Sequence, residues 1–268
     1  MLAPSPVVKK VAKDALKKDY VKSMVVSCIL VFAFFIIMLT SSLISVFAGE
    51  VGYYVSFGFM LYLGLAPLAL GALCFFRRLT FEQNDSVLII FRYFSSADEY
   101  KRAVYLISIL TVKLFLVGFV LFLPCIIVYI LSSEKLYKLL GVALPHWTSN
   151  LWTLNSFLAI IALLGLVFIM LKYYLSALIF VSSDDIDPAE AVNMSTIISK
   201  RTGADFFGMS LSFIPWMLLS VLIAPLIFTL PYFITSYCVH GRFAITDYNI
   251  DVDKFNSNTT PSFSTDEI

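Results

Sequence analysis

Long stretches without a charged side chain constrain this chain more than any other feature. Residues 23–48 contain no Asp, Glu, Lys, Arg or His, and a helix of that length, at about 1.5 Å per residue, exceeds the ~30 Å hydrocarbon core of a bilayer. Charged residues make up 14% of the chain, against about 25% in soluble domains, so little of it suits an aqueous surface. We therefore predict an all-α fold, a polytopic membrane helix bundle.

Further apolar runs divide the rest of the chain into spans. A second run follows a short break at residues 49–52. The uncharged run at 206–239 would be about 51 Å long as one helix, and it contains three prolines, which kink or end helices. We predict a hairpin that turns near Pro225, with one long broken helix as the alternative. A single membrane domain, residues 1–245, then holds six spanning segments at 23–48, 51–76, 104–131, 151–182, 206–222 and 225–240.

Basic residues predict the orientation, because Lys and Arg accumulate in cytoplasmic loops. Six precede the first span and five lie between the second and third, eleven in all, whereas the loop after the third span has two. We therefore expect a multi-pass protein of the cell membrane with a cytoplasmic N-terminus, and six crossings return the C-terminus to the cytoplasm. The polar tail, residues 246–268, is expected to be disordered because it has little apolar area to bury.

Two short segments outside the spans are amphipathic or apolar. Residues 7–20 place lysines on one face of a helix and apolar residues on the other, so this basic helix could lie on an anionic leaflet or form only the solvated start of the first span. Residues 87–91 are too short to span and too apolar for a free loop. We expect them in the interface, with Asn84, Asp85 or Ser86 as the helix cap.

A second cytoplasmic interfacial helix is predicted at residues 187–203. Asp187 can cap it, Pro188 suits its first position, and Glu190 completes a capping box. Gly203 suits a left-handed C-cap. Asp184, Asp185 and Asp187 could instead coordinate a divalent cation, but capping explains Asp187 more simply, so no metal site is predicted.

Motifs for catalysis are missing from the sequence. The four cysteines stand alone in apolar runs, without a CxxC pair, and the two histidines are far apart and expected at the membrane interface. There is no GxSxG, GxxxxGK[ST] or HExxH motif. We predict no enzyme, no catalytic residue and no cofactor, and the net charge of +1 argues against a nucleic-acid partner.

Several groups of residues match a family pattern. In the C-terminal half they are Lys172-Tyr173-Tyr174-Leu175-Ser176-Ala177, Asp187-Pro188, Glu190-Ala191, Ser195, Phe206-Phe207, Leu211-Ser212-Phe213-Ile214, Trp216 and Pro231-Tyr232. In the N-terminal half they are Lys10, Ala12-Lys13, Ala15-Leu16-Lys17, Pro67-Leu68, Gly71 and Phe75-Phe76-Arg77, leading to Phe91 and Phe94. With these residues the chain resembles the DUF975 family of bacterial integral membrane proteins. That family is of unknown function, so the resemblance implies a membrane fold and supplies no catalytic residue.

Lys113 and Lys172 are the charged residues within the predicted spans. Counted from the cytoplasmic boundary, both lie at about 14–16 Å depth, and no predicted span offers a carboxylate to pair with them. If they face the interior they need an anion, such as a lipid phosphate or an anionic solute; the alternative is that both snorkel to the interface.

Two classes of function therefore stay open. The first is a non-enzymatic membrane factor that interacts with the lipid bilayer, including anionic lipid, or with other membrane proteins. The second is a small transporter or channel for an anionic or amphiphilic solute, with proline-broken helices lining its path.

Overall fold

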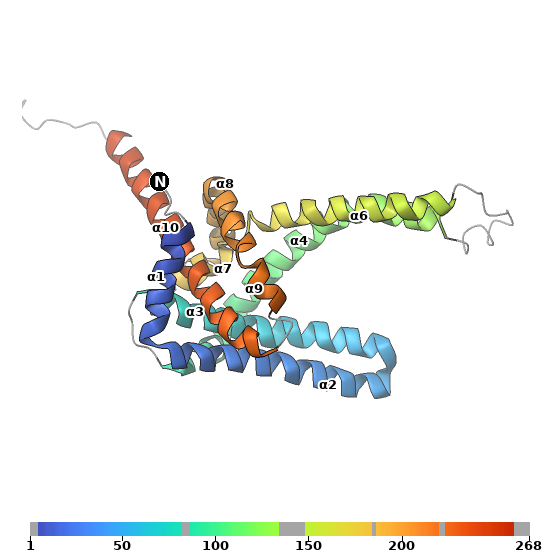
Figure 1. Ribbon diagram of the computed structural model, residues 1–268, viewed down its shortest axis with the longest axis horizontal. Helices are drawn as coiled ribbons and strands as arrows, with labels where there is room; N and C mark the ends of the chain where they lie inside the picture. Colours follow the sequence, from blue (N-terminus) through green and yellow to red (C-terminus); the bar gives the residue numbers. More distant parts are fainter. Residues whose placement is uncertain (1–4, 82–85, 134–147, 184–185, 220–222, 260–268) are drawn as a thin grey trace, which may run out of the picture.

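The described part of the chain consists of helices joined by short turns, with no strand. The computed structural model describes residues 5–81, 86–133, 148–183, 186–219 and 223–259. Within them, three helical stretches are long and apolar enough to cross a membrane, namely Tyr20–Thr80, Ala97–Leu131 and Leu151–Met170. Figure 1 shows two long hairpins that extend to the same side, while α1, α7 and α8 gather with the N-terminus at their other end. The predicted all-α class is confirmed for these residues.

The first hairpin consists of α2 (Tyr20–Met60), the π-helix η1 (Leu61–Leu65) and α3 (Ala66–Thr80). Its reversal lies at Gly49, whose φ of 67° is a left-handed conformation that glycine adopts without steric cost. The rings of Phe34 and Phe57 meet edge to face across the hairpin, 6.1 Å apart. The predicted break at 49–52 is thus a sharp turn, and the two limbs run antiparallel (Figure 1).

The π-helix η1 has a cause in the sequence. The carbonyl of Leu63 faces Pro67 four residues on, and proline has no N–H to donate. The hydroxyl of Tyr100, near the start of α4, donates to this carbonyl at 3.0 Å. A side chain from another helix therefore supplies the donor that the proline lacks.

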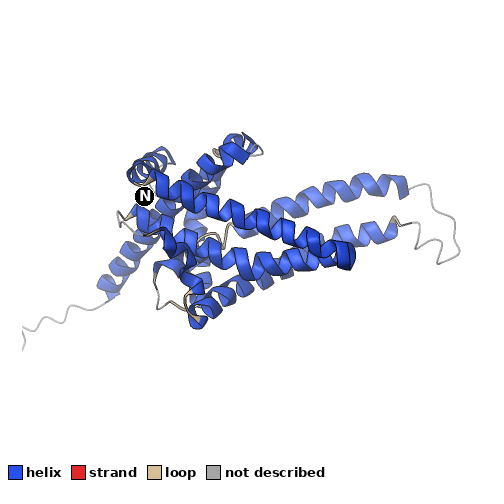
Figure 2. Cartoon of the chain, turned by 90° about the horizontal axis from the view of Figure 1, so that it is seen from below, coloured by secondary structure: helices blue, strands red, loops and turns tan. Residues whose placement is uncertain are grey.

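The second hairpin pairs α4 (Ala97–Leu131) with α6 (Thr148–Met170), which run side by side in both views (Figures 1 and 2). Ser96 caps α4 by accepting the N–H of Glu99 at 3.2 Å. Near the far end, the rings of Tyr129 and Trp152 meet at 6.3 Å. The predicted span 151–182 is wrong as a single helix, because α6 ends at Met170 and α7 (Ser176–Ser182) begins after a five-residue break.

The short helix η2 (Val87–Phe94) packs on α3 through a close backbone approach. A Cβ atom at Gly71 would lie 2.0 Å from the carbonyl oxygen of Ile90, so only glycine fits there. Ser86 caps η2 by accepting the N–H of Leu88 at 3.3 Å, whereas the other predicted caps, Asn84 and Asp85, lie outside the described residues. Ile90 is buried, whereas Leu88, Phe91 and Phe94 are exposed, so η2 presents apolar side chains on its outer side, and its place in the membrane interface stays a prediction.

Three helices complete the chain, namely α8 (Pro188–Leu211), α9 (Ile214–Leu219) and α10 (Ile223–Thr259). Asp187 caps α8 as predicted, since its Oδ2 accepts the N–H of Ala189 at 3.0 Å. The predicted C-cap at Gly203 is wrong, because α8 continues two further turns to Leu211. The ring of Phe206 in these turns stacks on Tyr174, and this tertiary contact outweighs the roughly 1 kcal/mol that a helical glycine costs.

The end of the chain folds back as a hairpin. α10 packs against both α8 and α9, so the run at 206–239 is not one long broken helix. Residues 220–222, between α9 and α10, lie outside the described residues. The prediction of disorder from residue 246 is wrong as far as Thr259, where α10 ends, because extending a formed helix adds one hydrogen bond per residue fixed and no Gly or Pro interrupts residues 246–259. Residues 260–268 of the predicted tail are not described.

The basic helix α1 (Ser5–Lys18) docks on the protein with its apolar face. Val8 and Ala12 are buried in one cluster with Met209, Phe213 and Val239. Most of that apolar face is therefore covered by the protein, although Val11 is 37% exposed, and α1 is more than the solvated start of the first span. Its lysines form the exposed and half-exposed side.

Candidate functional site at the helix break

The break between α6 and α7 gathers polar contacts from two other helices, α8 and α10. After Met170 the backbone makes tight turns: the N–H of Lys172 donates to Ile169 and that of Tyr173 to Met170, both at 3.0 Å. The regular helix resumes at Ser176. A break in an apolar segment is costly unless its freed backbone groups find partners.

Two serines of α8 supply partners for the break. Ser195 donates to the carbonyl of Lys172 at 3.1 Å and accepts the N–H of Leu175 at 3.2 Å. Ser199, one turn further along α8, donates to the same Lys172 carbonyl at 3.0 Å. Ser195 is fully buried. The break is thus held by specific hydrogen bonds and is part of the folded structure.

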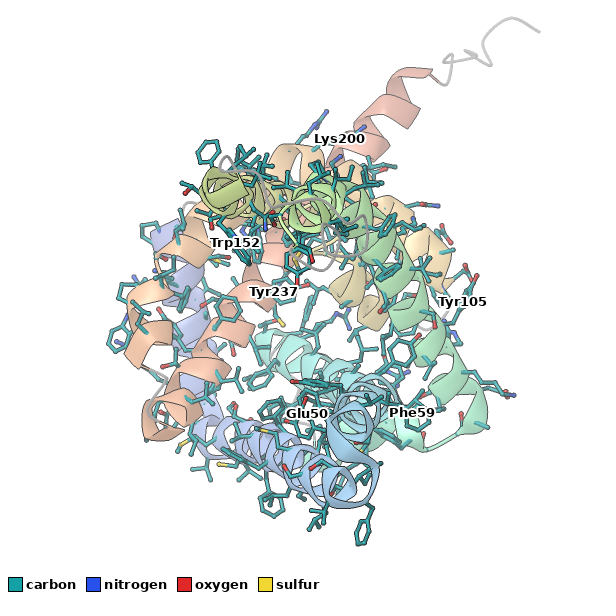
Figure 3. The ribbon with its side chains drawn as sticks, turned by 90° about the vertical axis from the view of Figure 1, so that its right-hand side faces the viewer. Glu50, Phe59, Tyr105, Trp152, Lys200 and Tyr237 are labelled. Carbon is teal, nitrogen blue, oxygen red and sulfur yellow. The ribbon has the colours of Figure 1, made fainter. Side chains whose placement is uncertain are left out.

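Tyr174 connects the break to α10. Its hydroxyl lies 2.7 Å from Thr202 Oγ1 and 3.1 Å from His240 Nε2, and the hydroxyl of Tyr237 donates to the Tyr174 carbonyl. Tyr237 appears in the interior of the molecule in Figure 3. Phe206 stacks on the Tyr174 ring with 4.1 Å between centroids. A buried polar network therefore joins α8 and α10 at the break.

A cavity of about 550 Å³ opens beside the break, between the end of α6 and α8. Lys172 and Lys200 line it together with Thr196 and Ser199, and the rest of its wall is apolar or aromatic. No Asp or Glu is among the lining residues. The side chains of both lysines are exposed. Two ammonium groups without a carboxylate make this cavity attractive to an anion.

Of the two lysines predicted as a site, Lys172 lines the cavity and Lys113 contacts the next residue of the break, Tyr173. Lys172 lies in the break itself, while Lys113 projects from α4 with its ammonium 5.7 Å from the ring centroid of Tyr173. Tyr173 also lines the cavity, but Lys113 does not. Binding of a ligand by Lys113 and Lys172 stays a prediction.

Several residues of the site carried no predicted role. Ser195, Ser199 and Thr202 follow the i, i+4, i+7 spacing of one helix face, which was the available signal for a polar face on α8. His240 was expected at the membrane interface; the structure shows it 2% exposed, with its Nε2 3.1 Å from the hydroxyl of Tyr174, so it packs inside the protein. Cys74, Cys125 and Cys238 are buried, whereas Cys28 is exposed.

The polar groups at the break serve the fold, and the lysines line the cavity. Within the described residues no three His, Cys, Asp or Glu side chains gather as metal ligands; Asp184 and Asp185 lie outside them. The hydroxyl groups of Ser195 and Ser199 donate to the Lys172 carbonyl, and the hydroxyl of Tyr174 is hydrogen-bonded to Thr202 Oγ1 on α8. The exposed ammonium groups of Lys172 and Lys200 are the charged groups that a ligand in the cavity would meet.

Fold and site together define a protein that is helical throughout its described segments, with long apolar helices and a broken segment whose backbone is bound by side chains of α8 and α10. A family described as "Protein of unknown function (DUF975)" matches residues 2–243. The chain belongs to this family, which confirms the resemblance drawn from the sequence. No curated protein and no solved structure matches it.

Proposed function

We propose that the protein is a non-enzymatic integral membrane protein that binds anionic lipid at the cavity beside the helix break. The observation that carries this proposal is the pairing of Lys172 and Lys200 in a cavity whose described lining contains no carboxylate. A lipid phosphate offers the missing charge, and its oxygens accept hydrogen bonds from lysine. Lys113, above the ring of Tyr173, adds positive charge on the side of α4.

The proposed setting is a cell membrane crossed six times, with both termini in the cytoplasm. The eleven basic residues before the third span support this orientation. The two long hairpins extend to one side and α1 lies at their other end (Figure 1), which supports a basic cytoplasmic face. In this proposal η2 and α8 are the two interfacial helices, and the bilayer is the main partner. Other membrane proteins are further partners through the exposed apolar faces.

The alternative is a small transporter or channel for an anionic or amphiphilic solute. The broken α6–α7 segment favours it, because discontinuous helices with bound backbone groups line substrate sites in many transporters. In this case Lys172 contacts the solute as it passes. In proteoliposomes, uptake of a fluorescent anionic solute that falls with Lys172→Met favours this alternative.

Lipid binding is tested by replacing lysines with methionine, which keeps a long apolar stem. We expect Lys172→Met and Lys200→Met, which remove the two ammonium groups of the cavity, each to reduce retention of phosphatidylglycerol in native mass spectra several-fold, and Lys113→Met, outside the lining, to reduce it less. Lys101→Met is the matched control, because Lys101 is exposed and pairs only with Asp98 in its own helix. Unchanged retention in Lys172→Met and Lys200→Met, with an unchanged melting temperature, contradicts the proposal and leaves snorkelling as the role of Lys172.

A further inference from the structure

A second cavity, of about 500 Å³, lies between α1, α9 and α10, and it shares no lining residue with the cavity at the helix break. On one side it is lined by three lysines of α1, Lys9, Lys13 and Lys17. They are spaced four residues apart and thus cover about 12 Å along one face of the helix. The opposite side is aromatic, formed by Phe213, Trp216, Phe228 and Tyr232.

The three lysines differ in what they contact. Lys9 donates to Ser212 Oγ at 2.5 Å, and its ammonium lies 4.7 Å from the ring centroid of Phe213. Lys17 pairs with Asp14 at 3.3 Å. Lys13, between them, has no ion-pair partner among the residues that the structure describes. The cavity lining contains no Asp or Glu. An added anion is therefore attracted most strongly at Lys13, the middle one of the three lysines.

The aromatic side of the cavity is open. Trp216 is 57% and Phe228 52% exposed. Tyr20, the first residue of α2, also lines the cavity, so the cavity lies at the end of the first long apolar helix. A small soluble anion leaves these rings uncovered, and a zwitterionic lipid compensates the lysines poorly. One molecule with an anionic headgroup and an apolar chain matches both sides.

We propose that this cavity binds an anionic phospholipid, with the phosphate at Lys13 between Lys9 and Lys17 and an acyl chain along Trp216 and Phe228. This site is independent of the one at the helix break. It gives the docked helix α1 a binding role: Val8, Ala12 and Leu16 attach the helix to the protein, and the lysines next to them hold the headgroup. The phosphate oxygens and the lysine ammonium groups form charge-assisted hydrogen bonds.

Fluorescence quenching by brominated lipids tests the proposal on the full chain. With Trp147→Phe and Trp152→Phe, Trp216 is the one tryptophan left. In micelles doped with dibrominated phosphatidylglycerol we expect at least two-fold stronger quenching than with dibrominated phosphatidylcholine at the same mole fraction. Lys13→Gln should remove this difference. Lys10→Gln should keep it, because Lys10 carries the same charge on the same helix but lies outside the cavity.

Three results overturn the proposal. Equal quenching by the two lipids in the unsubstituted single-tryptophan protein means that the cavity does not select an anionic lipid. A difference that survives Lys13→Gln places the headgroup elsewhere. An equal loss in Lys10→Gln and Lys13→Gln shows only general attraction to a basic helix. Far-ultraviolet circular dichroism and the melting temperature establish that each variant is folded, and both lysines are exposed, so both variants should fold.

Discussion

The hydroxyl of Ser195 lies 3.1 Å from the carbonyl oxygen of Lys172, so a side chain of α8 replaces a bond that a continuous helix would make along its own backbone. The same oxygen atom of Ser195 accepts the N–H of Leu175 on the other side of the break. One small side chain therefore joins both ends of the broken segment. The segment keeps its broken shape only while α8 is folded back against it.

Ser195→Ala should lower the free energy of unfolding by about 1–3 kcal/mol, because it leaves the buried N–H of Leu175 without a partner. Thr196→Ala is the control, since the Thr196 hydroxyl bonds only to Asn193 in its own helix, and it should stay within about 0.5 kcal/mol of the unsubstituted protein. Denaturant unfolding in detergent, followed by circular dichroism, measures both. Equal losses in the two variants would count against Ser195 as the group that holds the break.

Gly71→Ala should destabilise the protein by at least about 1–3 kcal/mol. Its Cβ atom would lie 2.0 Å from the Ile90 carbonyl oxygen, and a backbone atom cannot move aside as a flexible side chain can. Gly208→Ala is the matched substitution on α8, where a Cβ atom meets nothing within 4 Å, so it should be neutral or stabilise by up to about 1 kcal/mol. The melting temperature should fall for Gly71→Ala and stay unchanged or rise for Gly208→Ala, and an equal decrease in both would contradict the close approach.

Features that depend on neighbouring residues in the chain could be predicted from the sequence. The uncharged runs identified the long apolar helices, because charge is costly in hydrocarbon wherever the rest of the chain lies. Asp187 followed by Pro188 and Glu190 identified the start of α8, since capping uses atoms within one turn. The turn at Gly49 is equally local. Each of these signals is read within a few residues.

The candidate site depends on contacts between distant residues, and the sequence predicted it only in part. Lys172 stood out as a charge in an apolar run, but the break around it needs Ser195 and Ser199 from α8 and Tyr237 from α10. The burial of His240 likewise follows from its contact with Tyr174, 66 positions away. The pattern of neighbouring residues in the sequence does not predict contacts such as Tyr174–His240, because these contacts form only when α8 and α10 pack against the break.

Tyr100→Phe should lower the free energy of unfolding by roughly 0.5–1.5 kcal/mol, because the Leu63 carbonyl loses the hydroxyl that donates to it opposite Pro67. Tyr105→Phe, on the same helix, removes a hydroxyl from a side chain that is 52% exposed (Figure 3), and it should change little. Denaturation midpoints of the two variants in detergent provide the comparison. A larger effect at Tyr105 would contradict the role given to Tyr100.

Membrane topology is tested by single cysteines in a background without the four native ones. A membrane-impermeant maleimide added to intact cells should label Glu50→Cys, at the outer turn of the first hairpin. It should not label Ser5→Cys or Ser262→Cys until the cells are permeabilised. The reason is the eleven basic residues before the third predicted span, because Lys and Arg accumulate in cytoplasmic loops. Labelling of Ser262→Cys in intact cells would favour an odd number of spans.

Substitutions of Asp187 distinguish its role as the helix cap of α8 from a role as a cation ligand. Asp187→Ala should cost roughly 0.5–2 kcal/mol of stability through loss of the bond from the Ala189 N–H. Asp187→Asn keeps an oxygen in the capping position and should remain within a few tenths of a kcal/mol of the unsubstituted protein, because Asn and Asp cap about equally well. A cation site would behave differently, since it depends on the carboxylate charge. Two results together would show that Asp187 acts as a cation ligand and not as a cap. They are equal losses of stability in the two variants and a melting temperature that Ca²⁺ raises only when Asp187 is present.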